Sequence, residues 1–234
     1  MEQQAKLSGK KIIASIKLLS IELVIVLIAF ISCFITVVFF IKLIFVKNEQ
    51  QFDQSVFDLL GNYVSSNTTA VMNFFTFFGG QYFLIPANIL LIIYLFFIKK
   101  NTWFAIRILS VSISSLILMF FLKYIFQRPR PLIPLLKEAQ GLSFPSGHAF
   151  MSFAFFGLLI YMVNKKVTQS WLKYSLTIFF FLFTTFVGLS RIYLRVHYAS
   201  DVIAGFCLSL MWLVISLFIL QRIEKYKTKL PAVQ

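Results

Sequence analysis

Charged residues are scarce in this 234-residue chain and make up 13% of it, whereas a soluble domain carries about 25%. Hydrophobic residues account for 59% of the sequence and aromatic residues for 18%, with 30 phenylalanines. This composition excludes an ordinary water-soluble domain. It predicts helices that face lipid, each of which needs about 20 apolar residues to cross the hydrocarbon.

Cysteine, histidine and acidic residues are also few. The two cysteines, Cys33 and Cys207, fall inside hydrophobic runs, so we interpret them as small apolar packing residues. The eight acidic residues form no cluster near the motifs described below that could hold a metal ion. We therefore expect neither a metal nor another cofactor.

The formal net charge of +14 could indicate nucleic-acid binding, because clustered Lys and Arg neutralise phosphates. Most of the basic residues lie just beyond hydrophobic runs, however, where they determine membrane topology. We therefore expect membrane lipids as partners, and no nucleic acid. The sequence does not determine the oligomeric state.

Uncharged runs predict six transmembrane helices, because a lone segment in lipid must satisfy its own backbone hydrogen bonds. They cover residues 21–45, 71–98, 103–126, 148–164, 174–190 and 201–221. A short interfacial helix is predicted between the first two spans, where apolar residues recur at helical spacing. Its apolar positions are Phe52, Val56, Leu59, Leu60 and Tyr63, opposite Asp53, Gln54 and Asp58. The predicted fold is all-α, with one polytopic membrane domain over residues 1–234.

The second predicted span contains Gly79, Gly80 and Pro86. These residues could mark a bend that admits lipid sideways, or they could allow close packing of helices, since small residues let backbones approach. We favour close packing.

The distribution of charge predicts the orientation, because cytoplasmic segments carry an excess of Lys and Arg. The basic residues that would lie inside are Lys6, Lys10, Lys11, Lys17, Lys99, Lys100, Arg107, Lys165, Lys166, Lys173, Arg222, Lys225, Lys227 and Lys229. The first outside loop carries Glu49, Asp53 and Asp58 against Lys47. Both termini are therefore predicted to be cytoplasmic.

Six basic residues remain in the predicted outside loops, against this bias: Lys123, Arg128, Arg130, Lys137, Arg191 and Arg195. Membrane topology does not explain basic residues at these positions, so we infer that they bind an anionic ligand. Lys123, Arg130 and Arg191 would bind phosphate oxygens, which a guanidinium matches with two parallel donors. Ser146 and Gly147, at the start of the fourth span, would add backbone N–H groups and the positive end of a helix dipole.

The only two histidines lie in the same predicted outside segments as these phosphate-binding residues. Together they form a candidate active site. His197 and Asp201 are four residues apart, so the carboxylate can accept from one imidazole nitrogen and leave the other free to attack phosphorus. His148 is the second titrating group and is placed to protonate the leaving oxygen. This chemistry predicts a phosphohistidine intermediate without a metal.

Three stretches that carry these residues resemble the motifs of the type 2 phosphatidic acid phosphatase family, Lys-x6-Arg-Pro, Pro-Ser-Gly-His and Ser-Arg-x5-His-x3-Asp. They are residues 123–131 (KYIFQRPRP), 145–148 (PSGH) and 190–201 (SRIYLRVHYASD). The resemblance implies that His197 is the nucleophile and His148 the acid and base. It also implies a lipid phosphate as substrate, bound by Lys123, Arg130, Ser146, Gly147 and Arg191. Similar family members include bacterial phosphatidylglycerophosphate and undecaprenyl pyrophosphate phosphatases.

One departure is the doubled Arg-Pro, in which only Arg130 has the family spacing from Lys123. Arg128, Lys137 and Arg195 are expected to contact solvent or lipid headgroups instead.

The sequence thus predicts an integral membrane lipid phosphatase, a metal-independent hydrolase of phosphomonoesters or diphosphates, with its site at the extracytoplasmic face. The lipid itself stays open, and phosphatidic acid is a further candidate. A lipid phosphotransferase with the same intermediate and a lipid A phosphatase are alternatives. A non-catalytic anion or lipid transporter is a remote one, because transport favours polar groups near the midplane.

Overall fold

The computed structural model describes residues 2–135 and 140–229, with the backbone alone for 2–20, 22, 228 and 229. Its elements are α1 (Glu2–Ile41), η1 (Lys42–Val46), α2 (Gln51–Gly61), α3 (Ser66–Phe78), α4 (Gln81–Ile93), η2 (Tyr94–Ile98), α5 (Thr102–Phe126), α6 (Gly147–Lys166), α7 (Ser170–Tyr193) and α8 (Ala199–Lys229). No strand occurs in these described residues, so the all-α prediction is confirmed.

Six of the helical segments are long and apolar enough to cross a membrane. They are Leu23–Val46, Gln81–Ile98, Thr102–Phe126, Gly147–Lys166, Ser170–Tyr193 and Ala199–Lys227. Large apolar side chains on their outer faces are exposed, for example Ile117 at 64% and Phe120 at 60%. Surface of this kind is stable only against lipid, and the protein is an integral membrane protein.

The prediction for the second span was wrong at its beginning. Helix α3 ends at Phe78, and a turn at Gly79–Gly80 separates it from α4. A Cβ added at Gly79 would lie 2.4 Å from Cγ1 of Val187 on α7, so a side chain there would prevent the close approach of the two segments. The glycines therefore provide close packing, as expected, while Pro86 lies inside α4 without ending it.

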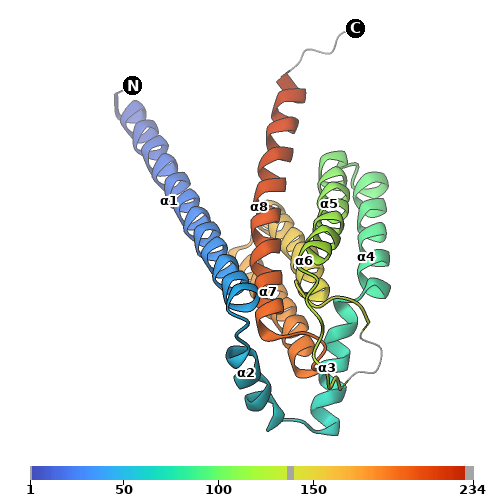
Figure 1. Ribbon diagram of the computed structural model, residues 1–234. Helices are drawn as coiled ribbons and strands as arrows, with labels where there is room; N and C mark the ends of the chain where they lie inside the picture. Colours follow the sequence, from blue (N-terminus) through green and yellow to red (C-terminus); the bar gives the residue numbers. More distant parts are fainter. Residues whose placement is uncertain (1, 136–139, 230–234) are drawn as a thin grey trace.

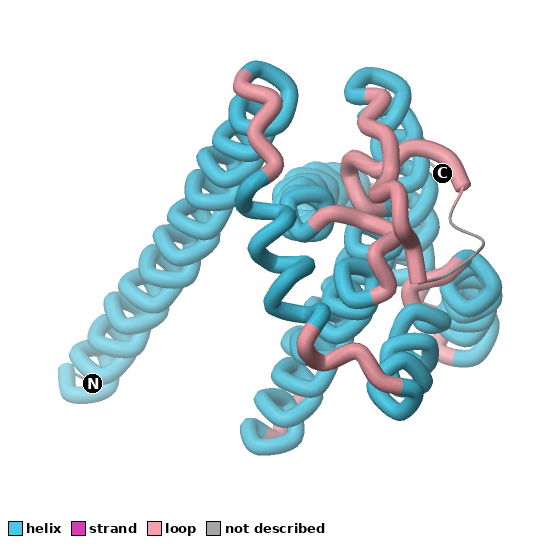
Figure 2. The backbone as a smooth tube through the Cα atoms, turned by 60° about the horizontal axis from the view of Figure 1, so that its bottom comes forward, coloured by secondary structure: helices cyan, strands magenta, loops and turns pink. Residues whose placement is uncertain are grey.

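The helices form a bundle in which α6 packs against α5, α7 and α8, and α1 packs against α8 (Figure 1). Helix α1 begins and α8 ends at the same end of the bundle, which we call the terminal end. At the opposite end α5 ends, α6 and α8 begin, and the short helices α2 and α3 lie beside the connecting loops (Figures 1 and 2). We call it the motif end, because all three motifs lie there.

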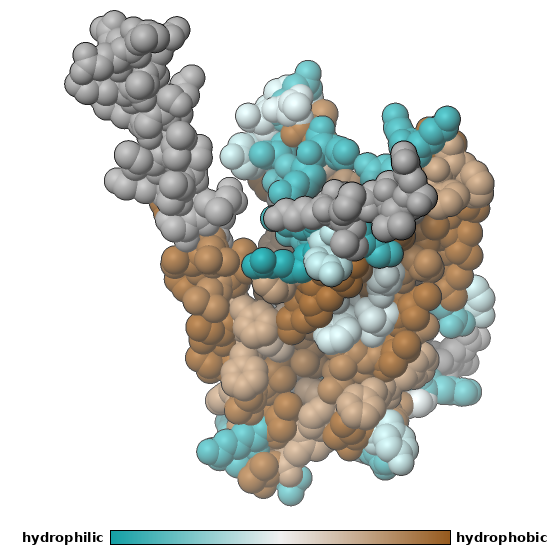
Figure 3. All heavy atoms as spheres, turned by 90° about the horizontal axis from the view of Figure 1, so that it is seen from above, coloured by the Kyte–Doolittle hydropathy of each residue, from teal (hydrophilic) through white to brown (hydrophobic). Residues whose placement is uncertain are grey.

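Apolar side chains fill the bundle between the two ends. One cluster includes Ile108, Val111 and Leu158, which are at most 1% exposed, and a second is centred on Phe155 and Phe156. Seen from the terminal end, hydrophilic residues gather in patches and hydrophobic residues cover much of the visible surface (Figure 3). The polar and charged residues of the three motifs therefore lie at one end of a bundle whose interior is apolar.

Candidate active site

The first motif lies where α5 ends. Gln127 adopts a left-handed conformation, with φ of 45°, and turns the chain out of the helix just after Lys123. Lys123 Nζ donates to the Leu142 carbonyl at 2.6 Å. Arg130 donates from Nε to the Gly141 carbonyl at 3.0 Å and from Nη1 to the Val196 carbonyl at 2.9 Å. These bonds attach the first motif to the loop before α6 and to the third motif.

The second motif begins α6. Ser146 is the N-cap, and its Oγ accepts from the Ala149 N–H. Its own N–H donates to the Asp201 carbonyl at 3.1 Å, so it is not one of the free donors that the sequence suggested. The N–H groups of Gly147 and His148, which follow it, have no backbone acceptor within the helix. A Cβ on Gly147 would lie 3.9 Å from Lys123 Cε, so the first two motifs lie side by side.

The third motif buries His197, which is 1% exposed. Its Nδ1 lies 3.6 Å from Oδ2 of Asp201 and 3.3 Å from Oγ of Ser143. The Ser143 hydroxyl donates to the same Asp201 oxygen, so both neighbours of Nδ1 are acceptors. The proton of the neutral ring therefore belongs on Nδ1, and the lone pair lies on Nε2 at the opposite edge of the ring.

The pKa of His197 is lowered to about 4, chiefly by burial and to a smaller extent by the charges of Arg130 and Arg191, against the opposing effect of Asp201. The imidazole is consequently neutral at pH 7. Both cations lie beside the segment that carries His197, because Arg130 donates to the carbonyl of the preceding Val196 and the Arg191 carbonyl accepts from the His197 N–H.

Arg191 lies in the last turn of α7 and is 5% exposed. It donates from Nη1 to Oγ1 of Thr76 on α3 at 2.5 Å, and its carbonyl accepts from the His197 N–H at 3.2 Å. Its Nε is buried without a hydrogen-bond partner among the residues that the structure describes. A buried guanidinium N–H in this condition is costly unless an anionic ligand accepts from it.

His148 is in the first turn of α6, against the turn between α3 and α4. Its Nε2 lies 3.5 Å from the position of a Cβ at Gly80, and its Cδ2 lies 3.2 Å from one at Gly79. The same Gly79 contacts Val187, one helical turn before Arg191. The glycine turn thus brings His148 to the side of α7 that carries Arg191.

Arg128 contradicts the expectation of a solvent or headgroup contact. It is 5% exposed and donates to Oδ2 of Asp53 at 2.8 Å and to Oδ1 of Asp201 at 2.5 Å. Its Cζ lies 3.9 Å from the centroid of the Tyr198 ring. A charge this deeply buried requires carboxylate partners, and Arg128 has two.

Asp53 also contradicts its predicted place on the polar, exposed face of the short helix. It is 2% exposed and accepts from the Ser200 N–H at 2.8 Å and from the Ser200 hydroxyl at 2.7 Å. Helix α2 turns Asp53 and Phe57 towards the bundle, whereas Leu59 is 60% exposed. In contact with lipid, apolar residues can face outwards while the charged residue finds its partners inside.

We call Asp53, Arg128, Ser143, Ser200 and Asp201 the carboxylate cluster, and Lys123, Arg130 and Arg191 the cation cluster. Sequence reasoning identified Asp201 and all three cations but missed the other four. Ser200 lies inside the third motif and Ser143 two residues before the second, and this position is the only signal that could have indicated them. Of the other predicted outside cations, Arg195 is half-buried with its guanidinium 5.9 Å from the Phe57 ring centroid, and Lys137 lies outside the described residues.

The chain resembles known proteins in sequence and in structure. The chain is 30% identical over 160 residues to phosphatidylglycerophosphatase B of Bacillus subtilis (strain 168), an alignment that covers 68% of this chain and 78% of the relative. Its structure resembles that of the first transmembrane PAP2 type phosphatidylglycerolphosphate phosphatase from Bacillus subtilis, with a TM-score of 0.75, 28% identity, and coverage of 83% of this chain and 96% of the other.

A second solved structure, that of Aquifex aeolicus LpxE, gives a TM-score of 0.54 at 27% identity and covers 70% of this chain and 94% of the other. Residues 104–225, which include all three motifs, match the family model of the PAP2 superfamily. This match spans more than half of the chain and contains every residue of the cation cluster, and the chain belongs to the PAP2 superfamily.

Proposed function

We propose that the protein hydrolyses a lipid phosphate monoester through a phosphohistidine at His197, with phosphatidylglycerophosphate as the first candidate substrate. Membership of the PAP2 family makes it a membrane enzyme that acts on lipid phosphates. The observation that carries the mechanism is a buried, neutral His197 whose Nδ1 faces Asp201, beside Arg191, whose Nε has no hydrogen-bond partner in the described part of the chain. The particular lipid is suggested by the names of the Bacillus subtilis relatives.

In the first step, Nε2 of His197 attacks the phosphorus and forms a P–N bond. The bond between phosphorus and the lipid oxygen breaks with its electron pair on that oxygen, which takes a proton from a protonated His148. The cation cluster would stabilise the charge that spreads over the three equatorial oxygens. Asp201 would stabilise the positive charge that develops on the His197 ring.

In the second step, His148 takes a proton from a water molecule, whose oxygen attacks the phosphorus. The P–N bond breaks, its electron pair returns to His197, and orthophosphate leaves. Metal-independent turnover is part of this proposal, because the three cations can neutralise the charge that a metal ion would otherwise neutralise.

We also propose that the motif end lies outside the cytoplasm and that both termini lie inside. The described side chains at the terminal end support this orientation, because they include Lys99, Lys100, Lys165, Lys166 and Lys173, and cytoplasmic ends of spans carry an excess of such residues. A green fluorescent protein fused to the C-terminus should be fluorescent, while an alkaline phosphatase fused there should be inactive. The reverse result would place the motif end in the cytoplasm.

The function is tested with the purified protein in detergent and a panel of lipid phosphates. Orthophosphate release should be fastest from phosphatidylglycerophosphate, compared with phosphatidic acid, undecaprenyl pyrophosphate and lipid A. It should persist in EDTA, and His197→Ala should abolish it. Lys47→Ala is the matched control, since it removes an exposed cation near the motif end and should leave the rate unchanged. Wild-type turnover by His197→Ala would refute the mechanism.

The intermediate and the acceptor need a separate measurement. Brief mixing with a ³²P-labelled substrate, followed by denaturation in alkali, should trap an alkali-stable, acid-labile phosphoprotein that His197→Ala lacks. Offering lipid or sugar alcohols then distinguishes the alternatives, because phosphate transfer to them in preference to water would make the protein a phosphotransferase.

A further inference from the structure

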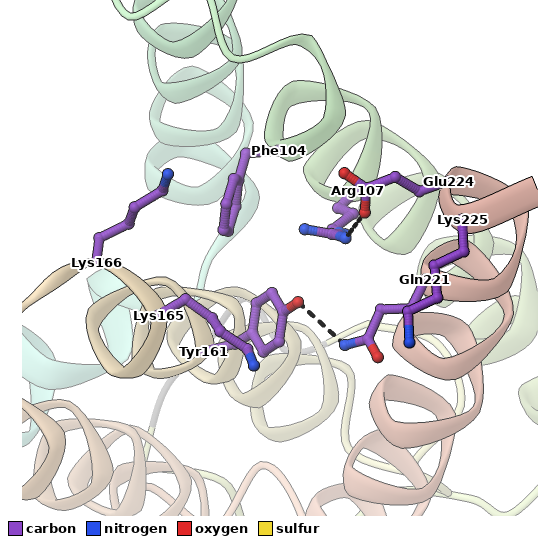
Figure 4. A pocket seen from close by; sticks show the side chains of 8 residues that line it. All are labelled: Phe104, Arg107, Tyr161, Lys165, Lys166, Gln221, Glu224 and Lys225. Carbon is purple, nitrogen blue, oxygen red and sulfur yellow. Dashed lines mark hydrogen bonds and ion pairs between the residues drawn. The ribbon is translucent and has the colours of Figure 1, made fainter. Parts of the chain in front are cut away.

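A second cluster of cations surrounds a cavity at the terminal end, far along the bundle from the motifs. The cavity has a volume of about 380 Å³ and lies between the beginning of α5, the end of α6 and α8 (Figure 4). Its walls carry four cations, Arg107, Lys165, Lys166 and Lys225, against the single carboxylate of Glu224. The cavity is therefore cationic.

Arg107 distinguishes this cavity from a group of exposed lysines that only determine membrane topology. It is 6% exposed, forms an ion pair with Glu224 through Nη2, and has its Nε buried without a hydrogen-bond partner among the described residues. Its Cζ lies 5.1 Å from the Phe104 ring centroid and 5.6 Å from that of Tyr161. One carboxylate therefore satisfies only part of a guanidinium that has five donors.

The other walls are also arranged to hold a polar group. Tyr161 Oη accepts from Nε2 of Gln221 at 3.1 Å, which joins α6 to α8 across one side of the cavity (Figure 4). Lys166 Nζ lies 5.2 Å from the centroid of the Phe104 ring. Lys165 and Lys166 are exposed, so the cavity is open where the bundle meets the headgroup region.

We propose that this cavity binds a phosphate-bearing anion, either the headgroup of an anionic phospholipid in the leaflet at the terminal end or a free phosphate compound. A guanidinium fork beside two lysines suits the tetrahedral oxygens of phosphate. The place of the cavity at the ends of three spans suits a lipid headgroup. This site is separate from the proposed catalytic site and does not depend on its activity.

The test measures binding of a fluorescent phosphatidylglycerol to the full chain in nanodiscs of phosphatidylcholine. The double variant Lys165→Ala/Lys166→Ala should bind it at least tenfold more weakly, since each lysine that contacts an anionic headgroup contributes about fivefold. Lys173→Ala/Arg222→Ala removes the same charge at the terminal end without altering the cavity lining and should change the affinity less than twofold.

Two further variants separate the role of Arg107 from folding and from the catalytic site. Arg107→Lys keeps the charge beside Glu224 but removes Nε and the fork, and should weaken binding several-fold with an unchanged unfolding midpoint. Arg130→Ala alters the motif end alone and should bind like the wild type. Equal losses in the two double variants, or a loss in Arg130→Ala with none in Lys165→Ala/Lys166→Ala, would overturn the proposal.

Inorganic phosphate and glycerol phosphate serve as competitors to identify the source of the anion. Displacement of the lipid at millimolar concentration would indicate a site for free phosphate compounds. Failure to displace it, together with the loss in the lysine variant, would indicate a lipid headgroup site.

Discussion

Two arginines at the motif end are equally buried but have opposite surroundings. Arg128 and Arg191 are each 5% exposed. Arg128 forms ion pairs with Asp53 and Asp201 and also donates to the Ser200 hydroxyl. Arg191 donates to the neutral Thr76 hydroxyl, and its buried Nε has no partner among residues 2–135 and 140–229. The charge of Arg128 is neutralised by carboxylates of the protein, so this arginine stabilises the site. The charge of Arg191 has no such carboxylate in the described structure, so it is available to an anionic ligand.

The largest expected effect is on stability, in Arg128→Ala. Removing the guanidinium leaves two buried carboxylates close together without a cation, and breaking a buried ion pair in this way costs about 3–5 kcal/mol. The unfolding midpoint in detergent should fall accordingly. Adding Asp53→Asn should recover part of the loss. An unchanged midpoint in Arg128→Ala would show that Arg128 does not stabilise the fold, contrary to the contrast with Arg191.

Arg191→Ala should instead reduce activity. Removing one donor from a developing oxyanion costs about 10²–10³ in rate, so kcat/KM for lipid phosphate should fall by that factor. The unfolding midpoint should stay close to that of the wild type, because the lost arginine has no carboxylate partner in the described structure. Arg191→Lys should recover only part of the activity, since an ammonium lacks the planar fork. A large fall in the unfolding midpoint without a specific loss of kcat/KM would show that Arg191, like Arg128, mainly stabilises the fold.

Asp53→Asn should have a smaller effect on stability than Arg128→Ala. The amide keeps the shape and can still accept from Ser200, but it weakens the bond to a charged partner, a loss of about 1–3 kcal/mol. Denaturant unfolding of this variant, Arg128→Ala and the double variant forms a thermodynamic cycle, and additive effects would show that Asp53 and Arg128 do not interact.

The smallest expected effect is a shift of the His197 pKa, on which the two clusters act in opposite directions. The pKa is lowered to about 4 mainly by burial, the nearby arginines lower it and Asp201 raises it. The ring should therefore stay neutral and nucleophilic as the pH falls from 7 to 5, and become protonated near pH 4.

His148→Gln leaves a single imidazole in the chain, so ¹⁵N NMR of labelled histidine in this variant reports the His197 titration alone. Adding Arg130→Ala should raise the pKa, and adding Asp201→Asn should lower it. A titration near pH 6.5 in His148→Gln would contradict the burial of the ring.

The sequence predicted the parts of the site that its motifs carry, and five of the six spans at nearly their observed positions. Hydrophobic runs identify spans well, because each must satisfy its own backbone within the lipid. The second span was misplaced because residues 71–78 are as apolar as a true span, and only tertiary packing against Val187 shows that Gly79 ends a helix there.

Asp53 and Arg128 were missed for a different reason. Helical periodicity assigned Asp53 to a polar face, and the rule that polar faces meet water does not hold for a helix beside lipid. The partner of a buried carboxylate can lie anywhere in the chain, and Arg128 is 75 residues away. No pattern in a single sequence pairs the two, whereas the spacing of His197 and Asp201 is local and could be interpreted directly.

The apolar clusters that fill the bundle between its ends have a consequence for substrate supply. Ile108, Val111 and Leu158 are buried between the two ends of the bundle, so under the proposed mechanism a charged headgroup would reach His197 from the leaflet that borders the motif end. Under the same mechanism, a phosphorylated lipid made in the opposite leaflet would first have to cross the membrane. Where that transfer is slower than hydrolysis, it would limit the rate of dephosphorylation in the cell, however fast the enzyme is in detergent.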